Sequence, residues 1–314
     1  MKTRIAFAAI VALIIFSSLT SAQENNPRQQ VRTVTIPISI FTKKELRESQ
    51  PEEYVQLERL IVREDDEEQQ ILSIRSVNTT PLSIAIVIQD DLTSTFNLQL
   101  TDIRNFIKGL PKGTRVMTAY SRAGSIDVRQ RFTDDLDLAA NSLRIVVGAP
   151  SIAPRSPFDG VEQVLSRFDS VPAGRRAILL FSDGLDSSEG LNLASIAQSF
   201  SLDQAILKAQ RRSVAVYSFY GPTQLTDSGN SIFVLAAQGA LAKLSDETGG
   251  RAFFQGSIAP VSYLPFFREL VMSLNRQFAL TYVSTHMKKG YHKVRVISTN
   301  PEIKIEHPRG YYYR

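Results

Sequence analysis

The pattern of apolar and polar positions divides the chain into three regions. In the first, residues 23 to about 80, apolar and polar side chains alternate with a period of two, as in VRTVTIPISIF (31–41). This alternation predicts strands with one buried and one exposed face. A second alternating stretch, residues 55–77, predicts a hairpin around the acidic run Arg63–Glu68, which we interpret as a solvated turn.

From Pro81 to about residue 276 the pattern changes to alternating strands and helices. Continuous apolar runs such as PLSIAIVI (81–88) and RRAILLFSD (175–183) are typical of strands that are covered on both faces. Segments with apolar spacings of three and four lie between them, among them 97–110 and 134–147, and predict helices. Alternation of this kind predicts a doubly wound, mostly parallel sheet with helices on both faces.

The last residues return to strand patterns, in QFALTYVST, YHKVRVIST and EIKIEHPRGYYY. Strands at both ends of an α/β region predict that the two ends pair into one small β-rich subdomain. The predicted organisation is therefore a signal peptide (1–22), an N-terminal β-rich segment (23–80), an α/β domain (81–276) and C-terminal strands that pair with the N-terminal segment (277–314).

The first 22 residues follow the secretory pattern. Lys2 and Arg4 precede an apolar stretch, Ile5 to Phe16, and small residues end at Ala22, where cleavage is expected. The apolar stretch is short for a membrane span, although an uncleaved anchor is the alternative interpretation. We expect an exported protein, periplasmic, cell-surface or secreted, without a membrane span after cleavage of the signal.

The amino-acid composition excludes some kinds of functional site and argues against one class of partner. The chain has no cysteine, which excludes a thiolate zinc site and a cysteine nucleophile. The net charge is +5, and Lys2 and Arg4 of the signal supply two of these charges. A balance this mild does not favour a nucleic-acid partner. The three histidines all lie in the C-terminal strand region, far in sequence from the acidic loops.

Oxygen-bearing side chains follow two of the predicted strands. Residues 89–95 (QDDLTST) come after the first buried strand, and residues 182–187 (SDGLDS) come after another. Because ligands bind at the carboxyl ends of parallel strands in such sheets, these two loops are the candidate site.

The order of these strings resembles the von Willebrand factor type A (VWA) domain, and most closely the VWFA-related Acidobacterial domain family of exported bacterial proteins. The resemblance rests on PLSIAIVIQDD, RRAILLFSDGLDSSEG, LAKLSDETGGRAFF and the closing KVRVIST…HPRGYYYR, and it covers nearly the whole chain after the signal. It implies a VWA-like α/β fold and a role in binding another protein.

The resemblance also implies Mg²⁺ or another divalent cation in a metal-ion-dependent adhesion site, which is built from a D-x-S-x-S loop, a hydroxyl from a second loop and an Asp from a third. Oxygen ligands of this kind suit Mg²⁺. The D-x-S-x-S positions fall on Gln89, Asp91 and Thr93, so the leading carboxylate is an amide and the first Ser is a carboxylate. The length of the predicted strand that begins at Pro81 favours this register, which starts at Gln89. A register shifted by two, on Asp91, Thr93 and Thr95, remains the alternative because it keeps the same face.

The candidate metal ligands are Asp91, Thr93, Ser156 and Asp183, and the candidate ligand-contact residues are Gln89, Asp90, Thr95 and Asp186. Ser156 precedes Pro157 and therefore also has the pattern of a helix N-cap. The Asp183-Gly184 pair also suits a strand-end turn. We interpret the site as a degenerate adhesion site.

The predicted function is a non-catalytic, protein-binding module for adhesion or assembly, whose protein ligand the sequence does not identify. A structural envelope protein that assembles through its β-rich ends, with the terminal GYYYR as contact element, is the alternative. A metal-dependent phosphohydrolase related to the haloacid dehalogenases is the less favoured alternative, since its nucleophilic Asp would be Gln89 here.

Overall fold

The computed structural model describes residues 31–43, 60–77, 80–148, 155–172, 174–190, 199–227, 231–256 and 258–313. The predicted signal peptide, residues 1–22, lies outside the described residues. Among the described residues, no helix has the length and apolar character needed to cross a membrane.

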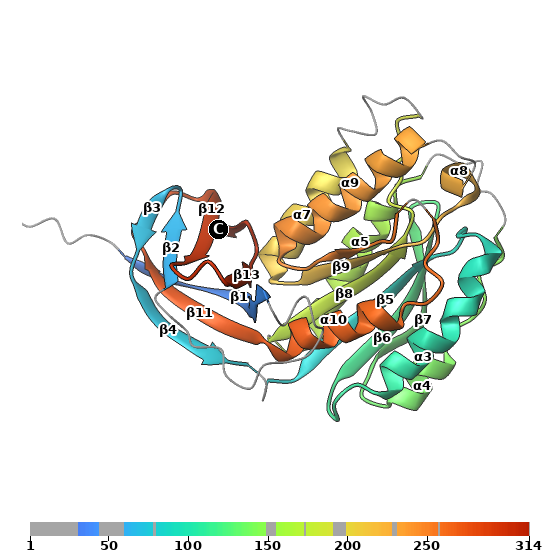
Figure 1. Cartoon of the computed structure of the whole chain (residues 1–314), viewed down its shortest axis with the longest axis horizontal. Helices are drawn as coiled ribbons and strands as arrows, with labels where there is room; N and C mark the ends of the chain where they lie inside the picture. The colour runs from blue at the N-terminus through green and yellow to red at the C-terminus, as the bar shows by residue number, and fades with distance from the viewer. Residues whose placement is uncertain are drawn as a thin grey trace, which may run out of the picture. The chain divides into compact units, whose positions relative to one another are not determined.

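A six-stranded sheet forms the centre of the α/β region (Figure 1). Its strands are β5 (Leu82–Gln89), β6 (Arg115–Arg122), β7 (Ser125–Thr133), β8 (Arg175–Ser182), β9 (Ala215–Tyr220) and β10 (Ala252–Phe253). The spatial order is β10-β9-β8-β5-β6-β7. All neighbours run parallel except the β6–β7 hairpin. The prediction of a mostly parallel sheet is confirmed.

Helices cover both faces of this sheet. One face carries α3 (Leu100–Lys108), α4 (Leu136–Asn141) and α10 (Leu264–Asn275), and the other carries α5 (Pro157–Leu165), α7 (Phe200–Arg212) and α9 (Ser231–Thr248). Short helical turns η1 (Ser94–Gln99), η2 (Ser166–Ser170) and α8 (Gln224–Asp227) complete this region.

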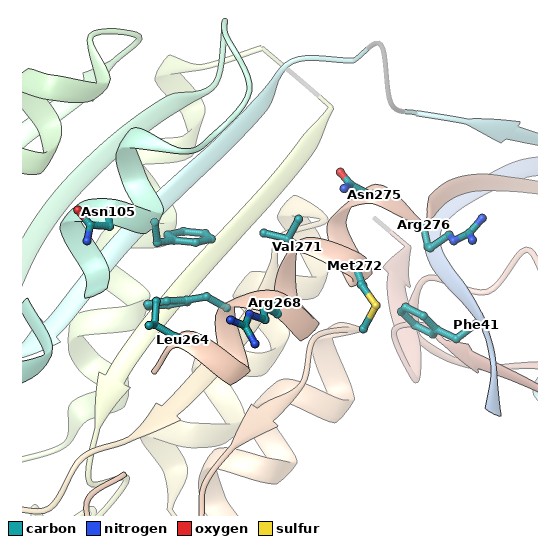
Figure 2. Close-up of a pocket in the computed structure, with 10 residues that line it drawn as sticks. Phe41, Asn105, Leu264, Arg268, Val271, Met272, Asn275 and Arg276 are labelled. Atoms are coloured by element: carbon teal, nitrogen blue, oxygen red, sulfur yellow. The ribbon is translucent and has the colours of Figure 1, made fainter. Parts of the chain in front are cut away.

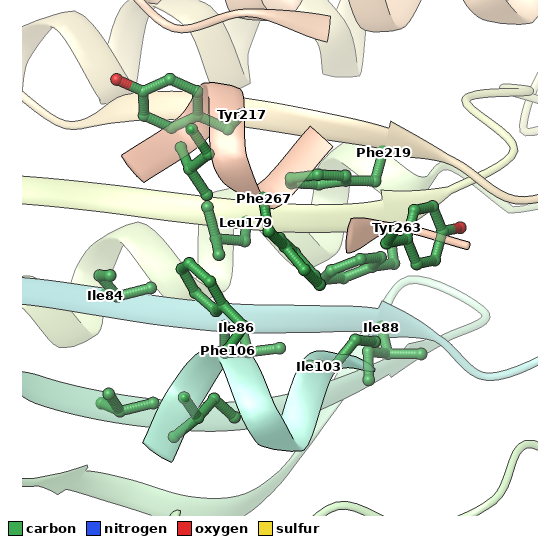
Figure 3. Packing of buried hydrophobic residues seen from close by; sticks show 14 of the residues in the cluster. Ile84, Ile86, Ile88, Ile103, Phe106, Leu179, Tyr217, Phe219, Tyr263 and Phe267 are labelled. Atoms are coloured by element: carbon green, nitrogen blue, oxygen red, sulfur yellow. The ribbon is translucent and has the colours of Figure 1, made fainter. Parts of the chain in front are cut away.

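The residues of β5 explain this two-sided packing. All eight are buried, and because side chains alternate along a strand, Ile84, Ile86 and Ile88 enter one core while Ala85 and Val87 enter the other. Figure 3 shows the three isoleucines in the first core, together with Ile103 and Phe106 of α3. Each fully buried isoleucine stabilises the fold by roughly 1.5–3 kcal/mol.

The helix predicted over residues 134–147 is shorter than expected. Helix α4 ends at Asn141, and the chain from Leu143 to Gly148 is irregular. Two tertiary interactions hold this segment in a non-helical path: Arg144 pairs with Asp90, and Asn97 exchanges two hydrogen bonds with the backbone of Val146. Side-chain partners outside the helix therefore override the local apolar spacing.

The two ends of the chain form a pair of four-stranded sheets, as predicted. The first has the order β13-β1-β11-β4, and the second has the order β14-β12-β2-β3. Their strands are β1 (Arg32–Thr42), β2 (Leu60–Glu64), β3 (Glu67–Gln69), β4 (Ile71–Ser76), β11 (Gln277–Ser284), β12 (Gly290–Ser298), β13 (Ile303–Glu306) and β14 (Gly310–Tyr313).

Pairing between the N-terminal and C-terminal strands is direct. Strand β1 runs antiparallel to β11 over eight residue pairs, and β2 runs antiparallel to β12 over five. The inward residues of both sheets share one apolar core that includes Val62, Leu280 and Val296. Asp65 and Asp66 form the predicted turn, at positive φ between β2 and β3. The rest of the acidic run was predicted wrongly as solvated turn, because its flanking residues belong to β2 and β3 and Glu64 is fully buried. The C-terminal string EIKIEHPRGYYY, by contrast, divides into two strands that join different sheets.

Candidate functional site

The candidate site lies where the carboxyl ends of β5, β8 and β9 meet. Backbone contacts join the loops that follow these strands: Thr93 N–H donates to Pro222 O at 2.9 Å, and Leu92 pairs with Thr223 in an isolated bridge. The segment that precedes α5 reaches the same place, because Ser187 N–H donates to Arg155 O at 2.8 Å. Four stretches that are distant in sequence therefore share one buried polar cluster.

Gln89 is the last residue of β5, and it links two of these loops. Its carbonyl oxygen accepts from the Ser182 hydroxyl at 2.6 Å and from the Asp183 N–H at 3.2 Å. Its amide group donates to Asp91 Oδ1 at 2.9 Å. The amide thus fills a position that needs a donor and an acceptor at once, which a carboxylate cannot provide.

Arg155 places its guanidinium between two of the predicted acidic residues. It forms ion pairs with Asp91 and with Asp183, the latter at 3.4 Å between Nη2 and Oδ2. The three side chains are 5%, 3% and 0% exposed, so this is a buried triad. Thr223 adds a hydroxyl that donates to Asp183 Oδ2 at 2.6 Å.

Asp183 is the most enclosed acid of the cluster. Burial raises its pKa, and the Arg155 guanidinium, the Thr223 hydroxyl and the Leu185 N–H oppose that rise. The following residue, Gly184, has φ +73°, and a Cβ atom there would lie 2.5 Å from Ala237 O in α9. A glycine is therefore required for the turn that brings Asp183 against Arg155.

Asp90 turns away from this triad and pairs with Arg144. The two side chains are joined by two hydrogen bonds, of 2.6 and 3.1 Å, and the Arg144 guanidinium also stacks on the Tyr120 ring. The hydrogen bond from Arg144 to Asp90 raises the pKa of Arg144 above its ordinary value. This pair anchors the segment after α4 to the end of β5.

Ser156 caps α5, as its sequence pattern predicted. Its hydroxyl accepts from Phe158 N–H, and Pro157 follows as the first helical residue. The same hydroxyl donates to Asp186 Oδ2 at 3.0 Å, and Ser199 also donates to Asp186. Ser156 and Asp186 therefore form a second buried group, in which Asp186 receives several hydroxyl groups.

Thr93 and Thr95 bond to each other at 2.7 Å near the surface. Thr95 is exposed, and its hydroxyl is directed at Thr93 rather than at the buried acids, whereas Gln89 contacts both Asp91 and the Asp183 backbone. Gln89 and Asp91 therefore belong to the buried cluster and Thr95 lies outside it, while the register of the family motif on this loop stays a prediction.

In this arrangement the residues do not fit a divalent cation. A metal ion needs its carboxylate oxygens to be directed at open space, but here Asp91 and Asp183 already hold a guanidinium. The Gln89 amide also directs N–H donors at Asp91 Oδ1. Mg²⁺ binding at Asp91, Thr93, Ser156 and Asp183 stays a prediction from the resemblance, and this geometry argues against it.

Sequence reasoning missed Arg155, Arg144 and Thr223. Arg155 is adjacent to the predicted Ser156, but a single Arg before a helix is a common surface pattern and gives no signal of burial. A search for the cation that two buried carboxylates require would have pointed to an Arg or Lys in a neighbouring loop.

A second cluster of metal-ligating side chains lies in the β-rich region. Ligand atoms of Glu64, Asp65 and His292 all lie within 4.8 Å of one another. His292 Nδ1 is 2.8 Å from Asp65 Oδ2, and its Nε2 is 2.6 Å from Lys288 O. Glu64 Oε1 is already occupied by the Ser284 and Tyr311 hydroxyls and by Arg32 at 3.4 Å. Glu64, Asp65 and His292 are therefore residue types that can bind a metal ion. As in the strand-end site, an arginine, here Arg32, already pairs with one of the carboxylates.

An apolar hollow lies elsewhere, between α3, α10 and β1. It measures about 460 Å³. Figure 2 shows Leu264, Val271 and Met272 of α10 lining it together with Phe41. The described residues that line it include no acid and no histidine.

Exposed apolar side chains surround the polar cluster on the strand-end face. Leu98 of η1 is 78% exposed, and hydrogen bonds from Asn97 and Gln99 fix the two neighbouring loops beside it. Those loops expose further large apolar side chains. The set, which we call the apolar rim, is Leu98, Ile145, Val147, Ile258 and Val261. A groove of about 380 Å³ runs between η1 and the loop that carries Ile258 and Val261.

No protein-family model and no curated protein matches the sequence. Several solved structures align with part of the chain. One is an aerotolerance-related membrane protein from Bacteroides fragilis, at 11% identity, covering 62% of this chain and 98% of that chain with a TM-score of 0.44. Another is the vWF domain of the type V pili tip protein Mfa5 from Porphyromonas gingivalis, at 12% identity, 63% and 94% coverage and a TM-score of 0.39.

A third is proximal thread matrix protein 1 from the mussel byssus, described with a zinc-occupied MIDAS motif. It is 14% identical, with coverage of 69% of this chain and 50% of that chain and a TM-score of 0.44. Matches with identities and TM-scores this low carry no information about the ligands of this chain. The mostly parallel six-stranded sheet, with helices on both faces and a polar loop after β5, has the VWA-like architecture that the resemblance predicted.

Proposed function

We propose that this protein is an exported, non-catalytic binding module that engages another protein through its strand-end face. The observation that carries the proposal is the apolar rim, five large apolar side chains between 64% and 89% exposed, gathered around loops that are fixed from within. Apolar side chains that cluster on a surface, rather than occurring singly, mark protein contact sites. Residues 1–22 would serve as the export signal and leave the chain from residue 23 as the working protein.

The interior of the face supports a binding role rather than catalysis. Asp91, Asp183 and Asp186 are all buried and hold hydrogen-bond or ion-pair partners, so each carboxylate has a structural task. The phosphohydrolase alternative requires a carboxylate nucleophile at the end of the first strand, and Gln89 supplies an amide that cannot attack phosphorus. Loops that are held rigidly by pairs between their own buried side chains are suited to binding another protein.

The structural alternative, assembly through the terminal tyrosines, has less support. Tyr311 donates to Glu64 inside the β-rich region, Tyr312 lies against Arg211, and Tyr313 lies under Arg32. These rings already contact the chain's own residues, as expected if they fill the subdomain.

Site-specific photo-crosslinking in the producing cell tests the proposal. A photoreactive side chain at Leu98 or at Val261 should give a discrete protein adduct, because both positions lie on the apolar rim. Leu72 of β4, which is 50% exposed in the β-rich region, is the matched control. An adduct at Leu72 and none at Leu98 or Val261 would contradict the proposal and favour assembly through the β-rich ends.

A further inference from the structure

We infer that the Arg155 guanidinium is the resident cation of the strand-end site and takes the place that a metal ion holds in an adhesion site of this design. The inference concerns the interior of the face, so it holds whether or not a partner binds at the apolar rim. It predicts a site that is assembled permanently and does not respond to divalent cations.

Charge balance is the first support. Asp91 and Asp183 come from the loops after β5 and β8, and they are 3% and 0% exposed. Two carboxylates buried this close together repel each other and require a cation or a proton. Arg155 contacts both of them, and an arginine keeps its charge at every physiological pH.

Geometry is the second support. The planar guanidinium directs Nη1 at Asp91 and Nη2 at Asp183, so one side chain joins the two loops. Arg155 belongs to a third loop, which ends at the Ser156 cap of α5. A metal ion at this position would bind the same three loops together. Arg155 therefore holds the loops together as a metal ion would, but its positive charge belongs to the chain itself.

The neutral side chain at position 89 is the third support, because it fits the charge balance of the cluster. With Arg155 in place, a third carboxylate in the cluster would leave the buried charge at minus two, counting Asp91 and Asp183. Gln89 is neutral, and it donates to Asp91 while it accepts from Ser182 and Asp183 N–H. An amide at the leading position is therefore matched to an internal monovalent cation, as a carboxylate is matched to a divalent one.

An arginine in place of a metal ion changes how a partner protein can be recognised. In a metal-centred adhesion site, the partner's carboxylate completes the coordination of the ion. Arg155 is 5% exposed and its charge is shared between two internal acids. Its Nε has no hydrogen-bond partner among the described residues, but it is closed to solvent, so a partner's carboxylate cannot reach it. A partner must instead be recognised by the side chains around the cluster, and chelators should leave that recognition unchanged.

Thermal unfolding of the full chain tests the inference, with melting temperatures measured in EDTA and in roughly 10 mM MgCl₂ or MnCl₂, which saturates weak protein sites. The unsubstituted protein should melt at the same temperature in all three. Arg155→Ala should melt roughly 10 °C lower, because it leaves two buried charges unpaired. MgCl₂ or MnCl₂ should restore part of that loss, because a cation can enter the space that the guanidinium leaves.

Arg144→Ala is the matched control. Arg144 also pairs with a buried aspartate of the same loop, Asp90, but it is 30% exposed and lies outside the triad. It should lower the melting temperature less and show no response to either cation. A rise of several degrees in the unsubstituted protein with MgCl₂ would overturn the inference, and so would an Arg155→Ala variant that ignores both cations.

A double variant covers the case in which Arg155→Ala does not fold. Asp91→Asn combined with Arg155→Met removes one acid together with the cation. If charge is the reason for the loss, this variant should fold and melt above Arg155→Met alone. An unfolded double variant would overturn the inference, because unpaired charge would then not explain the effect.

Discussion

At the residue scale, the character of the site depends on single hydrogen-bonding atoms. Gln89 provides both a donor and an acceptor within a cluster that is nearly closed to solvent, since it is 2% exposed. Buried polar groups of this kind cost free energy whenever one of their partners is lost. A change of one atom at position 89 should therefore have a large effect.

Gln89→Glu keeps the shape of the side chain and replaces the donor that faces Asp91 by a second carboxylate oxygen, 2.9 Å away in the present geometry. We expect the free energy of unfolding to fall by more than about 2 kcal/mol at pH 7. The loss should shrink as the pH is lowered toward about 4, where protonation removes the repulsion. Urea denaturation of the variant and of the unsubstituted protein at both pH values measures this loss of unfolding free energy. Gln70→Glu, at an exposed position, should change stability by less than about 0.5 kcal/mol, and equal effects of the two variants would contradict this expectation.

His307 provides a pH dependence with a definite sign. Its Nε2 accepts from Val296 N–H at 3.1 Å and its Nδ1 lies 2.9 Å from Pro308 O, which together suit the neutral ring. Burial lowers the pKa of His307 below its ordinary value of 6.5, and Arg309 and Arg295 lower it further. Above pH 6.5 the ring is neutral in both states, so the native contacts contribute fully. As the pH falls below 6.5 the unfolded chain takes up a proton more readily than the native one, and stability declines.

His307→Gln should therefore cost roughly 1–3 kcal/mol at pH 7, through the lost hydrogen bonds, and should weaken the decline between pH 7 and pH 5. Urea denaturation of the variant and of the unsubstituted protein at both pH values checks this. A decline of unchanged size in the variant would show that other groups cause it.

At the element scale, close backbone contacts decide how helices meet the sheet. The Thr248-Gly249-Gly250 turn joins α9 to β10, and a Cβ atom on Gly250 would lie 2.0 Å from Val216 O in β9. Thr248 also accepts from Val216 N–H, so this turn is bound directly to the strand. Glycine is required here by contact with another element and not by its own dihedral angles.

Gly250→Ala should consequently destabilise the protein by about 3 kcal/mol or more, because the strand and the turn must separate to admit the methyl group. Gly239→Ala is the control, since a Cβ atom on Gly239 of α9 would meet none of the described residues within 4 Å beyond the helix's own backbone. That change should be neutral or stabilise the helix by about 0.5–1 kcal/mol. Comparable losses in both variants would mean that the contact with Val216 is unimportant.

At the scale of the whole molecule, buried ion pairs connect the α/β region to the strands of the chain ends. Arg251, next to β10, donates to Glu306 of β13 at 2.8 Å and to Glu269 of α10 at 2.9 Å. Burial lowers the pKa of Arg251, but Glu306 and Glu269 outweigh it and the net direction is upward. A second arginine, Arg175 of β8, donates to Gln277 at the start of β11.

Arg251→Met should lower the free energy of unfolding by about 3 kcal/mol, because Glu306 is only 10% exposed and would keep only the more distant Lys304, at 3.5 Å, and the Ser273 hydroxyl, at 3.4 Å. Arg309→Met, which removes an arginine that is 58% exposed and pairs with the equally open Asp246, should cost less than about 1 kcal/mol. Urea denaturation of both variants makes the comparison. If Arg309→Met costs as much as Arg251→Met, burial does not decide the strength of these pairs.

The sequence by itself determined the layers of this protein. Period-two alternation at both ends and apolar runs between helical spacings follow from which side chains must leave water, and they predicted the central sheet, the covering helices and the pairing of the two chain ends. Local chemistry was equally readable: the Asp65-Asp66 turn and the Ser156 cap depend on neighbouring residues alone.

Tertiary structure alone decided what the polar loops do with their charges. The pattern located Gln89, Asp91 and Asp183 at strand ends, but it gave no sign that Arg155 would be buried between the two acids or that Arg144 would shorten α4 by pairing with Asp90. Such pairs join residues that are distant in sequence, and their strength depends on burial and distance, which a linear pattern does not contain. The partner of each charge is therefore a property of the folded chain.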